Sequence, residues 1–325
     1  MLQSPRWFAW LLILYVSLPI ARCMATHSIH SSDLTTLDLQ GHRGARGLRP
    51  ENTWPSFRTA IDFQMTTLEL DTVLTKDGAV IIHHDIETNP EICRNLDGTP
   101  IQKKSIYELT LSELKMLDCG SLKNSKFPEQ VPVPGTPLLT IEEFFRLVAQ
   151  EEGNRKKKGL PPLRFNIETK FPDPEKINES TVNALVKTLV SAIERAKTVE
   201  VSTIQSFYLP VLPLVKSLNP RIQTSALFAP TRPQGLWMIL GGGSGYRRGI
   251  LDQASRFQAD IISPYYLYVN SEFMHLARER RLRVIPWTVN DKQEMRRLIS
   301  LGVDGIITDY PDRLLDVVHD LKKSQ

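Results

Sequence analysis

Cysteine is scarce in this sequence, with three residues among 325. A chain of this length can bury a sizeable hydrophobic core, so its fold does not depend on a disulfide scaffold. An excess of one charge is also lacking, because 40 Lys and Arg oppose 36 Asp and Glu. The net charge of +4 gives no support to a nucleic-acid partner. The single basic run, residues 155–158, is interpreted as a solvated loop because no aromatic side chains are interleaved with it.

Long hydrophobic runs are missing after the N-terminus, so no later segment is expected to span a membrane. At the N-terminus, an apolar run from Trp7 to Ala21 follows Arg6, and small residues come after it. This arrangement is typical of a secretory signal peptide, which we assign to residues 1–25. The protein is therefore expected to be exported, either to a periplasm or out of the cell. A retained N-terminal membrane anchor is the alternative.

From residue 37 onward, short apolar or β-branched runs alternate with longer amphipathic segments. Strands that alternate with helices predict a parallel sheet covered by helices. Eight such units in about 290 residues match a (β/α)8 barrel of the TIM type in number and size, so we predict this α/β fold for residues 36–325. An open, doubly wound sheet is the alternative. The predicted strands are residues 37–40, 67–74, 163–168, 201–205, 222–228, 260–263, 283–288 and 305–308. The predicted helices are residues 53–64, 141–151, 182–197, 209–217, 271–280, 292–301 and 311–322.

Residues 86–137 interrupt this alternation and contain six prolines. About fifty residues are too many for a plain loop, so we predict a small insertion subdomain after the second strand, over one end of the barrel. In an oxidising compartment Cys93 and Cys119 are expected to form a disulfide within it, and two separate thiols are the alternative. Residues 231–255 form a second interruption. Its glycine run at 241–245 lacks the Lys and Ser/Thr of a P-loop and is interpreted as a flexible loop.

The candidate functional residues lie where predicted strands end, which in a (β/α)8 barrel places them on one rim. Glu69 and Asp71 share one face of the second strand because side chains alternate along a strand. Two unpaired carboxylates so close together inside a barrel would repel each other and be poorly solvated. A cation resolves this conflict, and Glu168 on the next barrel strand offers a third oxygen ligand. Three carboxylates without a thiolate suit Ca²⁺ or Mg²⁺ better than zinc.

Two histidines, His42 and His84, follow apolar strands at positions that core packing does not explain. Cleavage of a phosphodiester needs one group that takes a proton from the nucleophile and another that protonates the leaving oxygen. Imidazoles can do both near neutral pH. Arg43 and Lys170 are cations suited to phosphoryl oxygens. Trp287 either forms a wall of the substrate pocket or packs in the core, and the sequence leaves both open.

Eight short motifs stand in a characteristic order along the chain. They are His42-Arg43-Gly44, Pro50-Glu51-Asn52-Thr53, Glu69-Leu70-Asp71, Thr75-Lys76-Asp77-Gly78, His84-Asp85, Phe165-Asn166-Ile167-Glu168-Thr169-Lys170, Trp287-Thr288-Val289-Asn290 and Gly305-Ile306-Ile307-Thr308-Asp309-Tyr310-Pro311. In order and spacing they resemble the glycerophosphodiester phosphodiesterase family, of the exported type, from about residue 39 to the C-terminus. The resemblance implies a (β/α)8 barrel with a small insertion after the second strand. It also implies hydrolysis of a small-molecule glycerophosphodiester to sn-glycerol 3-phosphate and an alcohol.

The resemblance further implies roles at the matching positions. The acid–base pair would be His42 and His84, the ligands of one divalent cation, Ca²⁺ or Mg²⁺, would be Glu69, Asp71 and Glu168, and the phosphoryl group would contact Arg43 and Lys170. Glu51 would hold the loop after His42 or contact the glycerol hydroxyls. Asp85 is interpreted as an acceptor that orients the local backbone, and His83 is expected to point away from the site.

Two other functions remain open at this point. A relative on the same barrel could cleave lysophospholipid headgroups in the manner of a phospholipase D, which needs an apolar trough for an acyl chain. Tyr265, Tyr266 and Tyr268 could line such a trough. A catalytically silent barrel that binds a metal and an anionic surface or a host protein is the other alternative, although a pure binder has no need of paired histidines.

Overall fold

The computed structural model describes residues 31–172, 177–239 and 243–324. The predicted signal peptide, residues 1–25, lies outside the described residues, as do Gly241 and Gly242 of the glycine run. Within the described part of the chain, no helix is both long and apolar enough to cross a bilayer.

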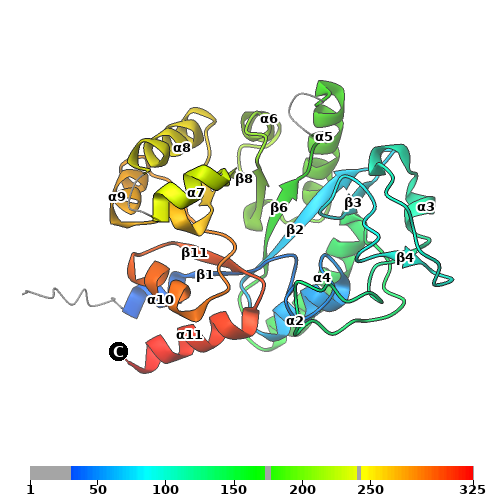
Figure 1. Ribbon diagram of the computed structural model, residues 1–325, viewed down its shortest axis with the longest axis horizontal. Coiled ribbons are helices and arrows are strands. Elements are labelled where there is room, and N and C mark those ends of the chain that lie inside the picture. Colours follow the sequence, from blue (N-terminus) through cyan, green and yellow to red (C-terminus); the bar gives the residue numbers. More distant parts are fainter. Residues whose placement is uncertain (1–30, 173–176, 240–242, 325) are drawn as a thin grey trace, which may run out of the picture.

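Eight parallel strands form a nearly closed barrel, with helices packed around it (Figure 1). The hydrogen-bonded order is β10-β9-β8-β7-β6-β2-β1-β11. Backbone hydrogen bonds from Asp304 N to Val284 O, 2.9 Å, and from Ile307 N to Pro286 O, 3.0 Å, close the gap between the first and last strands of this order. The predicted (β/α)8 barrel is therefore confirmed. The barrel strands are β1 (Asp38–Gly41), β2 (Thr67–Leu74), β6 (Arg164–Thr169), β7 (Ser202–Ser206), β8 (Gln223–Phe228), β9 (Ile261–Pro264), β10 (Arg283–Val284) and β11 (Gly305–Thr308).

One predicted strand, residues 283–288, is wrong in its length. Regular pairing of β10 ends at Val284, although the chain continues along the barrel wall. Pro286 has no backbone N–H, so it cannot donate a hydrogen bond to a neighbouring strand. Its carbonyl still accepts from Ile307, and Trp287 N donates to Pro264 O at 3.1 Å. The chain therefore remains extended after Val284, but it no longer forms the regular hydrogen-bond ladder of a β-strand.

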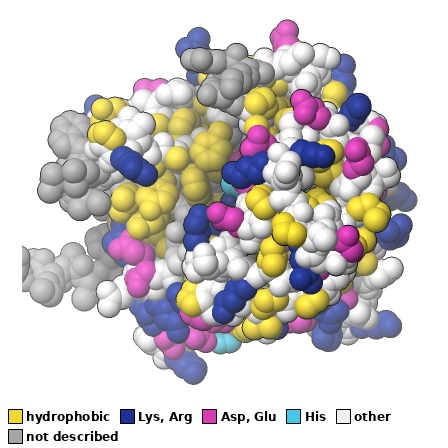
Figure 2. Space-filling view, turned by 45° about the vertical axis from the view of Figure 1, so that its right-hand side comes forward, with side chains coloured by type: hydrophobic (Ala, Val, Ile, Leu, Met, Phe, Trp, Pro, Cys, Tyr) yellow, Lys and Arg dark blue, Asp and Glu magenta, His cyan; other side chains and the backbone are white. Residues whose placement is uncertain are grey.

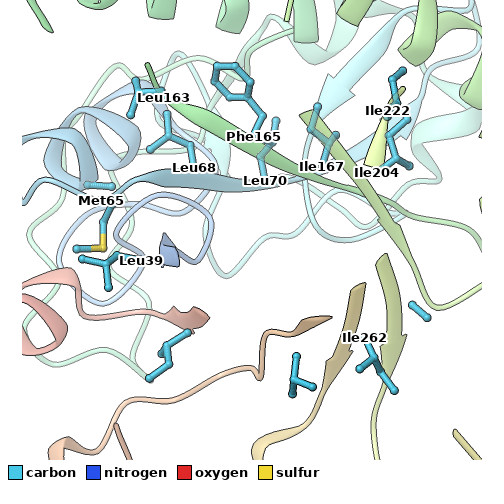
Figure 3. Close-up of a cluster of buried hydrophobic side chains, with 14 of the residues drawn as sticks. Leu39, Met65, Leu68, Leu70, Leu163, Phe165, Ile167, Ile204, Ile222 and Ile262 are labelled. Carbon is cyan, nitrogen blue, oxygen red and sulfur yellow. The ribbon is translucent and has the colours of Figure 1, made fainter. Parts of the chain in front are cut away.

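Alternation of side chains along the strands separates the core from the site. Leu68 and Leu70 of β2 are fully buried in the hydrophobic cluster between strands and helices, with Phe165 and Ile167 of β6 beside them (Figure 3). Glu69 and Asp71 therefore face the interior of the barrel, as the period of two predicts. The paired register of Asp71 with Glu168 places the third predicted carboxylate level with the second.

The outer layer contains two helices that the sequence did not predict. Residues 231–255 were noted only as an interruption of the alternation, but most of them belong to α7 (Arg232–Ile239) and α8 (Ser244–Arg256), and Ser244 and Gly245 of the glycine run begin α8. Gly235, Gly245 and Gly249 lie inside these helices, and glycine weakens a helical signal by about 1 kcal/mol per residue relative to alanine. The other outer helices are α2 (Trp54–Asp62), α4 (Ile141–Lys157), α5 (Glu179–Arg195), α6 (Val211–Leu218), α9 (Ser271–Glu279), α10 (Lys292–Ser300) and α11 (Pro311–Lys323), and α1 (Ser31–Thr36) precedes β1.

The basic run at 155–158 is also corrected by the structure. Helix α4 continues to Lys157, so Arg155, Lys156 and Lys157 form its last turn and not a loop. Cations at a helix C-terminus interact favourably with the helix dipole. The buried Arg155 guanidinium also donates to Pro161 O at 2.8 Å.

The insertion, residues 86–137, contains short elements and shares a second hydrophobic cluster with Val73 of β2 and Ile81 of β3 (Val80–Ile82). Its elements are β4 (Arg94–Asn95), the 3-10 helix η1 (Ile106–Glu108), α3 (Leu111–Leu114) and β5 (Leu117–Asp118). In Figure 1 it lies beside β2 and β3, the latter pairing antiparallel with β2. A disulfide joins Cys93 to Cys119, and both residues are buried with Ile106 and Leu114.

The turn after α5 allows a stability prediction. Lys197 follows the helix in the left-handed region, φ 59°, which favours glycine. Lys197→Gly is expected to raise the free energy of unfolding by up to about 1 kcal/mol, because relief of backbone strain exceeds the added entropy of the unfolded chain. Lys187→Gly, in the middle of the same helix, should lower it by about 1 kcal/mol. Chemical denaturation measures the free energy of unfolding of both variants. A change in the same direction for Lys197→Gly and Lys187→Gly would contradict the prediction.

Candidate active site

His42 follows β1 and is held by a partner from the other end of the chain. Its Nδ1 lies 2.7 Å from Oδ1 of Asp309, which follows β11. A carboxylate only accepts, so Nδ1 carries the proton and Nε2 is left 4.0 Å from Glu69 Oε2. Burial lowers the pKa of His42 to about 4, Arg46 adds to this effect, and Asp309 opposes it. His42 is therefore neutral at neutral pH, with a bare Nε2 that can accept a proton.

Arg43 connects the loop after β1 to the carboxylates. Its backbone is left-handed, φ 49°, and its N–H donates to Glu69 Oε2 at 2.7 Å. Its guanidinium lies 2.5 Å from Glu51 Oε1 and 3.1 Å from Asp71 Oδ2. Burial alone would lower the pKa of Arg43, but Glu51 and Asp71 raise it well above its ordinary value. Gly44 allows this turn, because a Cβ there would lie 2.6 Å from the backbone of Ser56.

The three predicted metal ligands come together inside the barrel. Ligand atoms of Glu69, Asp71 and Glu168 all lie within 4.8 Å of one another, and all three side chains are buried. Burial raises the pKa of Glu69 well above its ordinary value, and Asp71 and Glu168 add to this. Burial also raises the pKa of Glu168, to about 7, in spite of Lys170. The carboxylate of Asp71 behaves oppositely, because Lys170 and Arg43 outweigh its burial and lower its pKa.

The carboxylate cluster fits a hard divalent cation. Asp71 Oδ1 and Glu168 Oε1 are buried and accept no hydrogen bond of good geometry, which is rare for buried oxygens. The Lys170 ammonium approaches both, at 3.1 Å and 2.5 Å, and the Arg43 guanidinium reaches Asp71, but Arg43 also pairs with Glu51, so these two cations do not neutralise three ionised carboxylates. Oxygen donors alone are the ligand set that Ca²⁺ and Mg²⁺ prefer. The donors present are therefore suited to such an ion.

His84 follows β3 and is oriented by its neighbour. Its Nδ1 lies 2.7 Å from Asp85 Oδ1, and Asn89 donates to Asp85 Oδ2 at 2.8 Å. Asp85 is an acceptor, as expected, but its carboxylate holds two side chains and not the local backbone. Burial lowers the pKa of His84, and Asp71 and Asp85 partly offset this. His83 is buried and its Nδ1 lies 2.8 Å from Asp85 O, so it serves the local backbone.

A cavity of about 150 Å³ opens between these groups. Its polar and charged lining includes His42, Arg43, His84, Glu168 and Lys170. On the other side it is lined by what we term the apolar wall, Phe207, Leu227, Trp287 and Ile307. Figure 2 shows a histidine at the floor of a hollow, with hydrophobic side chains on one side and charged ones on the other.

Trp287 and Phe207 give the apolar wall its shape. Their rings pack edge to face, with centroids 5.5 Å apart, and Trp287 Nε1 donates to Ser263 O at 2.8 Å. Trp287 thus lines the cavity and also packs against its neighbours. The sequence had left open whether it forms a wall of the pocket or packs in the core, and in the structure it does both. Glu51 pairs with Arg43 and Arg46 of the loop after β1, and these two cations outweigh its burial and lower its pKa. It is not among the described residues that line the cavity, so its contacts are with that loop.

Four residues support the site without having been predicted to do so. Asp309 orients His42, and Arg46 donates to the same carboxylate at 2.9 Å. Asn52, also left-handed with φ 57°, donates to Asp71 Oδ2 at 2.8 Å. Gln205 of β7 donates to Glu69 Oε1 at 2.9 Å. Asn52 and Asp309 stand inside motifs noted in the sequence, whereas Arg46 and Gln205 carry no local signal.

These groups can serve one kind of substrate. Paired neutral imidazoles can move protons, while Arg43, Arg46 and Lys170 offer positive charge to an anion held among them. The barrel and this site define a (β/α)8 enzyme that acts on phosphoric diesters. Residues 42–313 match the model of the glycerophosphoryl diester phosphodiesterase family, and the chain belongs to that family.

Individual relatives agree with this assignment. The chain is 28% identical over 286 residues to a glycerophosphodiester phosphodiesterase of Caldanaerobacter subterraneus, covering 85% of this chain and 96% of the relative. It is also 26% identical over 299 residues to the human lysophospholipase D GDPD1, covering 86% and 85%. A solved structure from Silicibacter pomeroyi superposes with a TM-score of 0.76 at 26% identity, covering 89% and 97%. A phosphodiesterase from Oleispira antarctica superposes with a TM-score of 0.66 at 20% identity, covering 88% and 98%.

Proposed function

We propose that this protein hydrolyses glycerophosphodiesters to sn-glycerol 3-phosphate and an alcohol, with the help of a bound Ca²⁺ or Mg²⁺. The observation that carries this proposal is the buried carboxylate cluster flanked by His42 and His84 in one cavity. The Oleispira antarctica structure contains the product sn-glycerol-3-phosphate, which fits a small-molecule substrate of this kind.

The cation would be held by Glu69, Asp71 and Glu168. When bound, such an ion supplies positive charge to phosphoryl and hydroxyl oxygens. Arg43, which is buried, and Lys170, whose side chain is 13% exposed, line the cavity and add positive charge for the same phosphoryl oxygens. Charge of this kind is most effective where little water reaches it.

The two histidines would divide the proton transfers. His42, neutral and fixed by Asp309, accepts a proton at Nε2 from the nucleophile. His84 donates a proton to the leaving oxygen, and the nearby Asp85 carboxylate stabilises its charged form. Binding of a negatively charged phosphodiester beside His84 also raises its pKa, because an opposite charge favours the protonated ring.

The nucleophile is either water or the substrate's own glycerol 2-hydroxyl, which would first give a cyclic phosphate that water opens. In both routes His42 takes the proton of the attacking oxygen. A substrate without the 2-hydroxyl distinguishes them. Retained turnover of that substrate excludes the cyclic route.

The direct test is release of glycerol 3-phosphate from glycerophosphocholine by the purified protein, with Ca²⁺, with Mg²⁺ and with EDTA. Turnover that EDTA abolishes and a divalent cation restores would establish the reaction and the cofactor together. No turnover with any cation, from a folded sample, would reject the proposal and favour a lysophospholipid substrate or a silent binder.

Lysophospholipid cleavage is a second candidate, favoured by a hollow of about 250 Å³ beside the catalytic cavity. The two share Glu168, Lys170 and Phe207, and Phe171 and Tyr208 add apolar lining. An acyl chain could lie there. The tyrosines expected to form a trough are not among the described residues that line either hollow, and Tyr268 is 2% exposed.

Phe207, which is 46% exposed, tests this second candidate. Phe207→Ala is expected to lower kcat/KM for lysophosphatidylcholine about tenfold, because an apolar contact with the acyl chain is lost. Turnover of glycerophosphocholine should fall less, because Phe207 lines the catalytic cavity but this substrate has no acyl chain to contact it. The exposed Leu96, in the insertion, provides a control as Leu96→Ala. Equal losses on both substrates, or no turnover of lysophosphatidylcholine by the wild type, would reject this candidate.

We also propose that the protein works outside the cytoplasm. The disulfide between Cys93 and Cys119 supports this, because disulfides persist in oxidising compartments. The predicted signal peptide supports it independently. Localisation of the full chain and mapping of its mature N-terminus test the proposal.

A further inference from the structure

The insertion reaches the segments that carry both proposed catalytic histidines. Its first arm begins directly after His84 and Asp85. There, Asn89 Nδ2 donates to Asp85 Oδ2 at 2.8 Å, while Asp85 Oδ1 holds the His84 ring at 2.7 Å. The amide of Asn89 therefore fixes the carboxylate that orients His84. A carboxylate with only one of its oxygens held could rotate and carry the ring with it.

The second arm of the insertion holds the loop that follows His42. Gln130 is 2% exposed, and its Nε2 donates to Arg46 O at 2.8 Å and to Arg49 O at 3.2 Å. Val131 N donates to Leu48 O at 3.0 Å. The guanidinium of Arg46 lies over the Phe127 ring, 4.7 Å from its centre. This arm therefore supports the loop of His42 through backbone carbonyls and through Arg46, which shares Asp309 with His42.

The disulfide joins these two arms covalently. Cys93 lies four positions after Asn89, and its N–H donates to Asn89 O at 2.9 Å. Cys119 belongs to the second arm, where its N–H donates to Thr136 O at 2.9 Å. The bond between Cys93 and Cys119 thus connects the contact that orients His84 to the segment that supports the His42 loop.

We propose that the insertion is a brace that sets the relative position of His42 and His84, with Asn89 and Gln130 as its positioning residues. This inference rests on the proposed function for its kinetic consequences, but not for its structural ones. Neither residue lines the catalytic cavity, so each acts through another group. Displacement of a catalytic group by about 1 Å costs up to about 100-fold in rate.

Asn89→Ala tests the first arm, and Asn95→Ala is its matched control. Asn95 is an asparagine of the same insertion whose amide donates locally to Thr99 Oγ1 at 2.8 Å, away from the histidines. We expect Asn89→Ala to lower kcat for glycerophosphocholine about 10–100-fold with little change in KM, as loss of an outer hydrogen bond does in other sites. Asn89→Gln, which keeps the amide donor, should recover part of the loss, and Asn95→Ala should behave as wild type.

A second readout does not depend on turnover. Nitrogen-15 NMR of the histidine rings reports which ring nitrogen carries the proton, and His84 is identified by its absence in His84→Gln. In the wild type we expect the Nδ1-protonated form of His84, and in Asn89→Ala a mixture of both forms. An inactive wild type would reject the proposed function. The histidine spectra would still test whether Asn89 orients the His84 ring, because they do not depend on turnover. A His84 ring unchanged in Asn89→Ala would overturn the inference.

Gln130→Ala and the double change Cys93→Ser with Cys119→Ser test the second arm and the connection. For each variant, we expect the fold decrease in kcat to be larger than any fold increase in KM. The comparison uses protein whose circular dichroism spectrum matches that of the wild type at the assay temperature. Combined with Asn89→Ala, the cysteine change should lower kcat by less than the product of the separate effects, because both act on one brace. Wild-type kcat in both Gln130→Ala and the double cysteine variant would overturn the inference.

Discussion

Replacement of His42 by alanine is expected to lower kcat for glycerophosphocholine by about 10²–10⁴-fold, the range typical for loss of a general acid–base group. The reason is the bare Nε2 that Asp309 and burial together maintain. No other imidazole lines the described part of the cavity except His84, which is engaged with Asp85. The affinity for Ca²⁺ or Mg²⁺ should change little, because the carboxylates remain.

Steady-state kinetics and calorimetric titration with the cation measure the two effects separately. His275→Ala is a matched control, since His275 lies on α9 with its side chain 73% exposed. That variant should keep wild-type kcat. If His42→Ala retained more than about a tenth of the activity, His42 would not be the base, and His84 would be examined for that role.

The second large effect concerns the cation and its competition with protons. Ca²⁺ or Mg²⁺ is expected to raise the unfolding temperature of the wild type much more at pH 7.5 than at pH 5.5. At the lower pH the raised pKa values of Glu69 and Glu168 keep protons on the cluster, and a cation must displace them. A cation at 100 times its dissociation constant stabilises by about 2.7 kcal/mol, an effect large enough for thermal unfolding to detect.

The sign follows from the pKa of Glu168, about 7 in the folded protein. A raised carboxyl pKa stabilises the folded state below the unfolded pKa, and this stability is lost as the pH rises through about 7. For Glu168 the loss amounts to about 3 kcal/mol. His42 acts oppositely, because its lowered pKa removes stability as the pH falls from 6.5 towards about 4. The cation-induced shift is therefore the quantity to measure, since it depends on the carboxylates.

Glu168→Gln should bind the cation more weakly and show a smaller difference between the two pH values. The surface residue Glu200, whose side chain is 68% exposed and pairs with Arg221, provides the control Glu200→Gln. Its cation response should match that of the wild type. An equal cation-induced shift at both pH values in the wild type would show that no proton leaves the cluster, and would contradict the raised pKa values.

Much of the site could be predicted because its residues stand at the ends of strands. Glu69 and Asp71 face the barrel interior through the alternation of a strand, and the (β/α)8 arrangement brings Glu168 level with them. Local sequence patterns did not predict an element correctly where it contains glycine or proline. Glycines weakened the helical signal of α7 and α8, so neither helix was predicted, and Pro286 ended the regular pairing of β10 earlier than predicted.

The sequence by itself determined the barrel, the rim on which the site lies and the residue types that meet there, because these follow from local periodicity and from the order of strands. Only the tertiary structure decided which groups pair. His42 and Asp309 are separated by 267 positions, and Gln205 reaches Glu69 across 136. The shifted pKa values of His42 and of the carboxylates arise from burial and from charged neighbours, some of them distant in the sequence. Both depend on the folded surroundings of a side chain, which no local pattern contains.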